Sequence, residues 1–139
     1  MRLINFGVGE ITDRLSILAL KILHSKPGAD VTHFTNERAA LVAKLGSRNL
    51  GAGWFEQAAE LCGVNGIIWR DEDELRAIRT GELLNTNPVS IAALAVHLQE
   101  MNDRRHQLIE QINKKSGEFY GNEKVTDPVD AAVLESLKA

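Results

Sequence analysis

Several residue types are scarce in this sequence of 139 residues, and each shortage excludes a class of protein. Its one cysteine, Cys62, can form no disulfide within these residues and leaves no thiolate cluster for structural zinc. Prolines number three, and aromatic residues make up only 5%. No apolar run approaches the ~20 residues that a membrane-spanning helix needs. These shortages argue against a disulfide scaffold and a membrane span, and they favour helices because proline is the strongest helix breaker.

The charge balance gives no support for nucleic-acid binding. Sixteen Lys and Arg residues against nineteen Asp and Glu residues leave a formal net charge of -3, without the basic excess typical of nucleic-acid binders. The hydrophobic share of 44% and the charged share of 25% are those of an ordinary globular domain. The opening residues 1–6 lack the apolar core of a signal peptide, so we expect a cytoplasmic protein.

Apolar residues recur with helical spacing along most of the chain and predict four helices. The predicted helices run from Glu10 to about Ser25, from Thr32 or Thr35 to Gly46, from Trp54 to about Thr80, and from Pro88 to about Ser116. In the first of them Ile11, Leu15 and Leu18 recur at steps of four and three residues. The fourth has a sharp start, because Asn87 can cap it and Pro88 suits the first helical position.

The two long helices are joined by a short turn, which predicts an antiparallel hairpin. The predicted fold is therefore all-α, a helical bundle in which a hairpin of about Trp54–Thr80 and Pro88–Ser116 packs against two shorter N-terminal helices. Residues 1–126 are predicted to form one domain, and residues 127–139 a short helix or a mobile tail. The apolar stripes on the long helices are wider than four helices would cover, which favours a homodimer.

The third helix carries features that its periodicity does not explain. Gly63 and Gly66 each cost a helix interior roughly 0.5 to 1 kcal/mol relative to alanine, so we expect either a break or a close approach of another backbone. Cys62 lies beside the apolar line and is expected to be an inert core thiol. Trp69 is expected in the core, with a wall for a sugar or nucleotide ring as its alternative role. The charged run 70–74 is expected to face solvent except for Glu72, whose phase turns it inward.

Four polar residues lie on the apolar stripes, Asn65 and Glu72 on the third helix and Asn102 and Arg105 on the fourth. We expect all four to be at least partly buried. A hairpin that turns near residue 84 aligns residues whose numbers add to about 168, which places Glu72 near His97. A buried carboxylate needs a partner or a proton, so each of these polar groups is expected to meet another.

The polar stripe residues have two interpretations. They set the register of a structural seam, as a buried asparagine does in coiled coils, or they line a polar cleft between helices, a usual place for ligands in bundles. The cleft would be formed by Asn65, Trp69, Glu72, Asp73, Arg76, Asn102 and Arg105.

Residues 64–76, VNGIIWRDEDELR, resemble the N-x-x-x-W-x-x-E-D-x-x-R signature of bacterial all-helical families catalogued as domains of unknown function. The segments GEITDRLSIL at 9–18 and NDRRHQLIEQIN at 102–113 resemble further parts of the same pattern, and together the resemblance covers about two thirds of the chain. It implies a link to bacterial cell-surface polysaccharide and glycosyltransferase contexts. The residues that it singles out are Glu10, Asp13, Asn65, Trp69, Glu72, Asp73, Arg76 and Asn102.

Two classes of function remain open. The first is a non-catalytic helical module that binds a protein partner or a small polar or anionic ligand in the inter-helix cleft. The second is a divalent-metal-dependent hydrolase of nucleotides or nucleotide sugars, because Glu10-x-x-Asp13 is similar to half of the carboxylate pattern of all-α nucleotide pyrophosphatases. In that case Glu10, Asp13, Glu72 and Asp73 would hold Mg²⁺, which prefers carboxylate oxygens. Motifs of a hydrolase elbow, a P-loop or a zincin are absent from the sequence.

Overall fold

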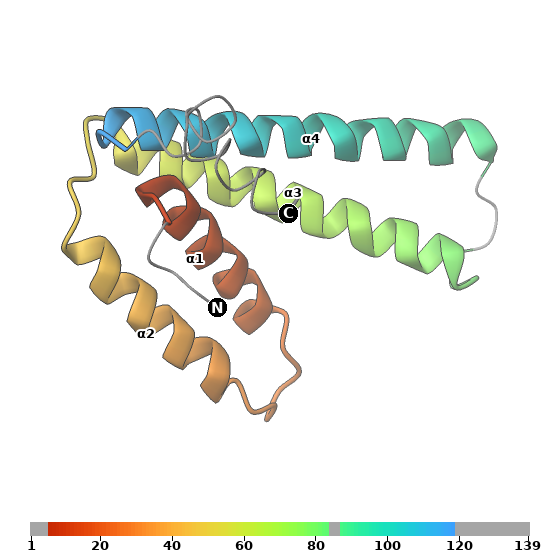
Figure 1. Ribbon diagram of the computed structural model, residues 1–139. Coiled ribbons are helices and arrows are strands. Elements are labelled where there is room, and N and C mark those ends of the chain that lie inside the picture. The colour runs from red at the N-terminus through yellow and green to blue at the C-terminus, as the bar shows by residue number, and fades with distance from the viewer. Residues whose placement is uncertain (1–5, 84–86, 119–139) are drawn as a thin grey trace, which may run out of the picture.

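The structure is a computed structural model that describes residues 6–83 and 87–118 of the chain. These residues form four helices and no strand: α1 (Val8–Leu23), α2 (Thr32–Gly46), α3 (Trp54–Arg79) and α4 (Pro88–Lys115) (Figure 1). The predicted all-α bundle is confirmed, and the helix bounds differ from the predicted ones by a few residues at most. The predicted short helix or tail at 127–139 and the domain boundary at residue 126 lie outside the described residues.

Helices α3 and α4 form the predicted antiparallel hairpin; they lie side by side near α1 and diverge toward the end where the chain passes from one to the other (Figure 1). The Gln57 side chain donates a hydrogen bond to the Gln111 side chain at 3.2 Å, and Nδ1 of His97 lies 2.5 Å from Oδ2 of Asp71. In both pairs the residue numbers add to 168, so the predicted register of the hairpin is confirmed.

The local sequence predicts the start of α4 correctly but not the interior of α3. The Asn87 side chain caps α4 by accepting a hydrogen bond from the backbone N–H of Ser90 at 2.7 Å, as predicted. The predicted break or close approach at Gly63 and Gly66 is wrong, because α3 is continuous and a Cβ at either position would meet nothing within 4 Å. Packing against α4 and strong helix formers elsewhere in α3 override the cost of the two glycines.

Helix α1 crosses the hairpin near its end, and α2 lies along α1 rather than along the hairpin (Figure 1). The crossing of α1 over α4 is tight, because a Cβ at Gly9 would collide with the backbone carbonyl of Ile109. Leu41 of α2 is buried against the apolar face of α1, and Leu45 reaches the core of the hairpin. Helix α1 thus packs directly on the hairpin, whereas α2 packs chiefly on α1.

The core lies at the end of the hairpin that α1 crosses. Its buried apolar residues form two clusters, one of Val8, Leu61, Val64, Ile68, Leu108 and Ile112 and one of Ile11, Leu18 and Leu41. Along α3 complete burial ends at Asp71, and beyond it Leu75 and Ile78 are only half-buried. The polar stripe residues therefore lie where the covered part of the hairpin gives way to the uncovered part.

Candidate functional site

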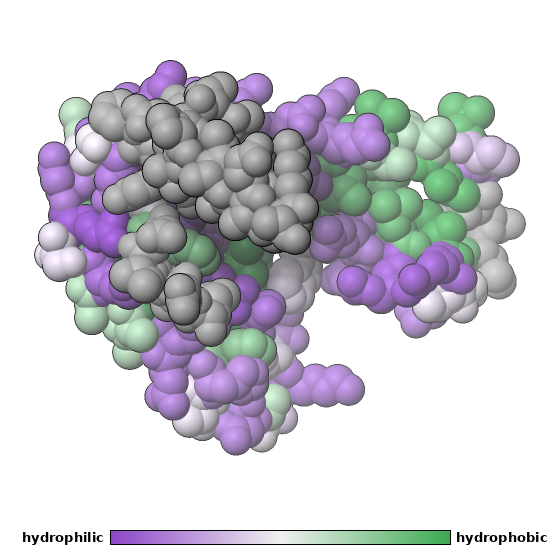
Figure 2. All heavy atoms as spheres, in the orientation of Figure 1, coloured by the Kyte–Doolittle hydropathy of each residue, from purple (hydrophilic) through white to green (hydrophobic). Residues whose placement is uncertain are grey.

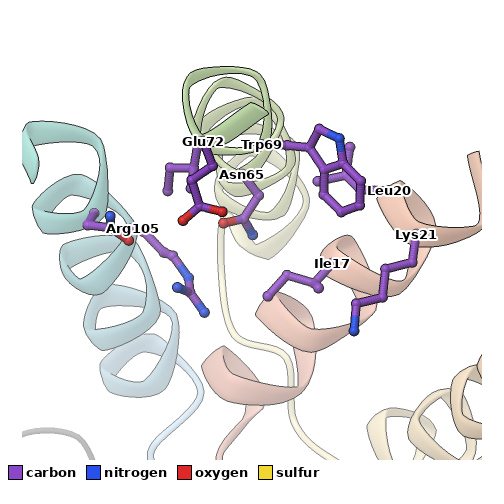
Figure 3. Close-up of a pocket in the computed structure, with 9 residues that line it drawn as sticks. Ile17, Leu20, Lys21, Asn65, Trp69, Glu72 and Arg105 are labelled. Carbon is purple, nitrogen blue, oxygen red and sulfur yellow. The ribbon is translucent and has the colours of Figure 1, made fainter. Parts of the chain in front are cut away.

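A pocket of about 230 Å³ lies between α1, α3 and α4 (Figure 3). It is lined by Ile17, Leu20, Lys21, Asn65, Ile68, Trp69, Glu72, Asn102 and Arg105. Five of the seven residues predicted for the polar cleft are thus brought together, from both helices of the hairpin. The pocket is smaller than the roughly 300 to 1,000 Å³ usual for drug-sized ligands, so it suits a compact ligand.

An ion pair between α1 and α4 underlies the pocket. Arg105 donates from Nε to Oδ1 of Asp13 at 2.8 Å and from Nη2 to Oδ2 at 2.6 Å. These hydrogen bonds raise the pKa of Arg105, burial opposes them, and the nearby charge of Glu72 adds to them, so the guanidinium stays a cation. The Asn65 amide donates to Asp13 at 2.9 Å and to Ser16 Oγ at 2.5 Å. The Asp13 carboxylate therefore accepts three hydrogen bonds, two from Arg105 and one from Asn65.

Side-chain oxygens from α3 gather at the mouth of the pocket. Glu72 and Asn65 turn oxygen atoms toward the space that Arg105 approaches from α4 (Figure 3). Within residues 6–83 and 87–118 the Glu72 carboxylate makes no ion pair, and the Asn102 amide donates only to the carbonyl of Leu98 on its own helix, at 3.2 Å. Hydrogen-bond acceptors at the mouth are therefore left for a ligand.

The predicted burial of Glu72 is wrong, because its side chain is exposed and Asp71 is the carboxylate that α3 buries. Asp71 is only 1% exposed, although the charged run was expected to face solvent there. The predicted neighbour of Glu72, His97, instead pairs with Asp71 at 2.5 Å. The buried positions Leu61, Val64, Ile68 and Asp71 recur at steps of three and four, so the apolar stripe continues one residue before the position expected.

An aromatic and apolar wall faces the polar groups. The Trp69 indole lies beside Leu20 (Figure 3), and its ring stacks on His24 with centroids 4.7 Å apart and planes 22° from parallel. Trp69 is half-buried rather than fully in the core, and its Nε1 has no acceptor in the described part of the chain. Ile17 and Ile68 extend the wall. The alternative role considered for Trp69, a wall for a sugar or nucleotide ring, stays a prediction.

Three lining residues of α1 were not predicted as site residues. Ile17 and Leu20 widen the apolar stripe of that helix, which is the signal that places them toward the hairpin. The Lys21 stem also lines the pocket, but its ammonium lies 5.5 Å from the centre of the Phe34 ring on α2. The Lys21 ammonium therefore contacts the Phe34 ring outside the pocket and contributes only its apolar stem to the lining.

The four carboxylates predicted to hold Mg²⁺ are not brought together. Glu10 accepts hydrogen bonds from the backbone of Gly7 at 2.9 Å and from the Asn113 amide at 2.9 and 3.0 Å. Asp73 pairs with Arg76 at 2.8 Å on the exposed side of α3, outside the pocket. Among residues 6–83 and 87–118, no three His, Cys, Asp or Glu side chains are placed to hold a metal ion. The predicted carboxylates instead have separate protein partners or, like Glu72, face solvent.

The start of α1 is fixed by side chains of Asn113, in the last turn of α4, and of Glu118, which follows that helix. The side-chain Oδ1 of Asn113 accepts from the backbone N–H of Gly9 at 2.7 Å, and the Glu118 carboxylate accepts from the backbone N–H of Val8 at 3.1 Å. Together with Glu10, which accepts from Gly7, they satisfy N–H groups that a helix start leaves unpaired. Asn113 was missed in the sequence, although it follows Ile109 by four residues on the stripe. This anchor holds the α1 wall of the pocket in place.

Cys62 is exposed, which contradicts its expected place in the core. Leu61 before it is buried, whereas Cys62 and Gly63 are both exposed. They lie on a side of α3 that no other described helix covers. Partial burial raises the pKa of its thiol, so the thiolate is scarce at neutral pH.

Comparisons with protein-family models, with curated proteins and with solved structures find no match for this chain. The resemblance to the N-x-x-x-W-x-x-E-D-x-x-R signature stays a prediction. None of the described helices has the length and apolar character needed to cross a membrane. The geometry of the pocket is therefore what supports a function.

Proposed function

We propose that the chain is a non-catalytic helical module that binds a compact polar ligand, rich in hydroxyl or amino groups, in the pocket between α1, α3 and α4. The observation that carries this proposal is the convergence of the Glu72 and Asn65 side chains opposite the apolar wall around Trp69, in a pocket that Asn102 also lines (Figure 3). A few convergent polar groups in an otherwise apolar recess are typical of small-molecule sites.

The available groups favour a ligand that donates hydrogen bonds over an anion. Two cations line the pocket, but Arg105 is neutralised by the carboxylate of Asp13, and the Lys21 ammonium lies at the Phe34 ring. The carboxylate of Glu72 remains as an unpaired acceptor within the described residues. A pocket of about 230 Å³ suits one sugar-like ring or a small amino compound better than a nucleotide sugar.

The same groups favour binding over catalysis. General acid–base chemistry needs titratable groups within reach of the same ligand atoms. Glu72 is the one carboxylate among the pocket-lining residues, whereas Asp13 is occupied by Arg105 and Asn65. The Asp13 network therefore serves to hold Arg105 and Asn65 in fixed positions beneath the ligand.

Thermal unfolding with named probes tests the proposal. We expect glucose, glucosamine or glycerol to raise the Tm, whereas inorganic phosphate does not. A probe at a hundred times its Kd adds about 2.7 kcal/mol, which corresponds to a rise of several degrees at this chain length. Glu72→Gln should reduce the rise strongly while changing the Tm of the free protein little, because Glu72 is exposed.

Glu74→Gln is the matched control, since it makes the same charge change at an exposed residue of α3 outside the pocket. It should leave the ligand-induced rise intact. The proposal is contradicted if none of the hydroxyl or amino probes raises the Tm, or if Glu72→Gln and Glu74→Gln respond to the probes equally.

A further inference from the structure

The first half of α4 is apolar around its whole circumference. Residues 88–99 contain no Asp, Glu, Lys or Arg, and up to Leu98 the only polar side chains are Ser90 and His97. Val89 is 79% exposed and Val96 is 53% exposed. Figure 2 shows apolar residues gathered over this end of the hairpin. A helix that is hydrophobic on all sides is ordinarily buried, so this segment lacks a covering layer.

The side of α4 that faces α3 is also incompletely covered in this half of the hairpin. Leu108 and Ile112 are fully buried where α1 crosses the hairpin. Ile91, Leu94 and Leu98 continue the same stripe toward the start of α4 and are only half-buried. Because α1 crosses the other half of the hairpin and α2 packs on α1, no described helix shields this half (Figure 1).

A second stripe runs along the opposite side of α4, formed by Val89, Ala92, Ala93 and Val96. Its order of large, small, small and large residues is the same in both directions. An antiparallel copy of the helix would therefore place Val89 opposite the partner's Val96, with the alanines at the crossing point. Small residues there let two helix axes approach to about 8 Å.

We propose that a second copy of this chain covers this surface, with the two α4 helices packed antiparallel across a two-fold axis. In such an interface both copies contribute the same surface, so a charge in it would be buried twice, with no opposite charge on the partner to pair with. The uncharged stretch 88–99 avoids that burial of charge. A second copy presents the same uncharged residues 88–99, so it provides the uncharged partner surface that this stretch needs.

The chain beyond Glu118 is less suited to cover this surface. Glu118 follows the opposite end of α4, and the helix extends about 28 Å from Val96 to Lys115 at ~1.5 Å per residue. Residues 119–139 would need roughly nine fully extended residues to run back that far before any of them packed on the surface. Only about twelve residues would then remain to cover the surface, and they include Asp130, Glu135 and Lys138, whereas residues 88–99 of a second copy carry no charge.

Sedimentation of the full chain from micromolar to submillimolar concentration tests the proposal. We expect a dimer that dissociates on dilution, and Val96→Glu should raise its Kd at least about a hundredfold, because each new carboxylate would be buried against the partner's Val89 without a counter-charge. Val42→Glu is the control, because Val42 lies on α2 and is also 53% exposed. The Kd of the Val42→Glu dimer should equal that of the wild type. Circular dichroism checks that both variants fold.

A charge-pair rescue tests the antiparallel arrangement itself. Val89→Lys alone should also weaken the dimer, whereas combining it with Val96→Glu places opposite charges across the axis and should restore much of the affinity. A wild type that stays monomeric at every concentration overturns the proposal, as does a dimer that Val96→Glu leaves intact or that Val42→Glu weakens equally. Failure of the double variant to recover affinity overturns the antiparallel pairing.

Discussion

Asp13 on α1 and Arg105 on α4 form an ion pair through two parallel hydrogen bonds, of 2.8 and 2.6 Å. The Asp13 side chain is 9% exposed and the Arg105 side chain 26%, so water screens the pair only weakly. Such a pair stabilises the fold modestly as a whole, but the loss of one partner leaves a poorly hydrated charge behind. The same pair also keeps the Arg105 guanidinium in place beneath the pocket.

Asp13→Asn is expected to lower the free energy of unfolding by roughly 2 to 4 kcal/mol, because Arg105 would keep its charge without a counter-ion. Urea unfolding measures the change. Asp73→Asn is the control, since Asp73 and Arg76 form an ion pair whose side chains are 55% and 58% exposed, and its loss should cost at most about 0.5 kcal/mol. If both variants lose the same small amount of unfolding free energy, the ion pair of Asp13 is not shielded from water.

Two glycines of helices should respond to alanine in opposite directions. Gly9→Ala should destabilise the fold by about 1 to 3 kcal/mol or more, because the new methyl group would collide with the carbonyl of Ile109 and push α1 away from α4. Gly63→Ala should stabilise it by roughly 0.5 to 1 kcal/mol, because the methyl group meets nothing within 4 Å and alanine favours the helix. Unfolding in urea compares the two, and a stabilising Gly9→Ala would contradict the tight crossing.

The helix bounds and the hairpin register were predictable because the signals that set them are local. The Asn87 cap and the proline after it fix the start of α4 within a single turn. The short connection between the long helices restricts their pairing, which is why Asp71 meets His97 at the expected register.

The identity of the buried carboxylate was not predictable from the same pattern. Asp71 and Glu72 are adjacent in sequence, and a step of one residue turns a helix by about 100°, so a small error of phase exchanges the buried and the exposed side chain. The choice depends on His97 across the hairpin and on where α1 stops covering α3. Neither is encoded within α3 itself.

The roles of Glu10 and Asp13 were equally hidden from sequence. Their spacing shows that they share one face of a helix, but not which donors reach that face from elsewhere. In the fold Asn113 meets Glu10 and Arg105 meets Asp13, partners that lie 103 and 92 residues away along the chain. The pairing follows from the tight approach of Gly9 to α4, a tertiary contact that sequence spacing does not record.

The contact between α1 and α2 provides a test of stability against pH. Arg14 donates to Glu37 from Nε at 2.6 Å and from Nη2 at 2.9 Å. The hydrogen bonds lower the pKa of Glu37 more than burial raises it, and the charge of Arg14 adds to the effect. Since the folded state then binds a proton less readily than the unfolded state, the contribution to stability is complete above the unfolded pKa and is lost as the pH falls through the lowered folded pKa.

Glu37→Gln should therefore lower the free energy of unfolding by up to about 1 kcal/mol at neutral pH, the upper range for a partly exposed pair. The difference from the wild type should shrink below the ordinary glutamate pKa of about 4.3 and vanish once Glu37 is protonated in the folded state as well. Urea unfolding from neutral pH to about pH 3 measures this, with Glu74→Gln as a control that removes an exposed carboxylate of α3. A difference that persists or grows at the acid end would mean that Glu37 acts through its shape or packing, because a charge interaction with Arg14 must disappear when the carboxylate takes up its proton.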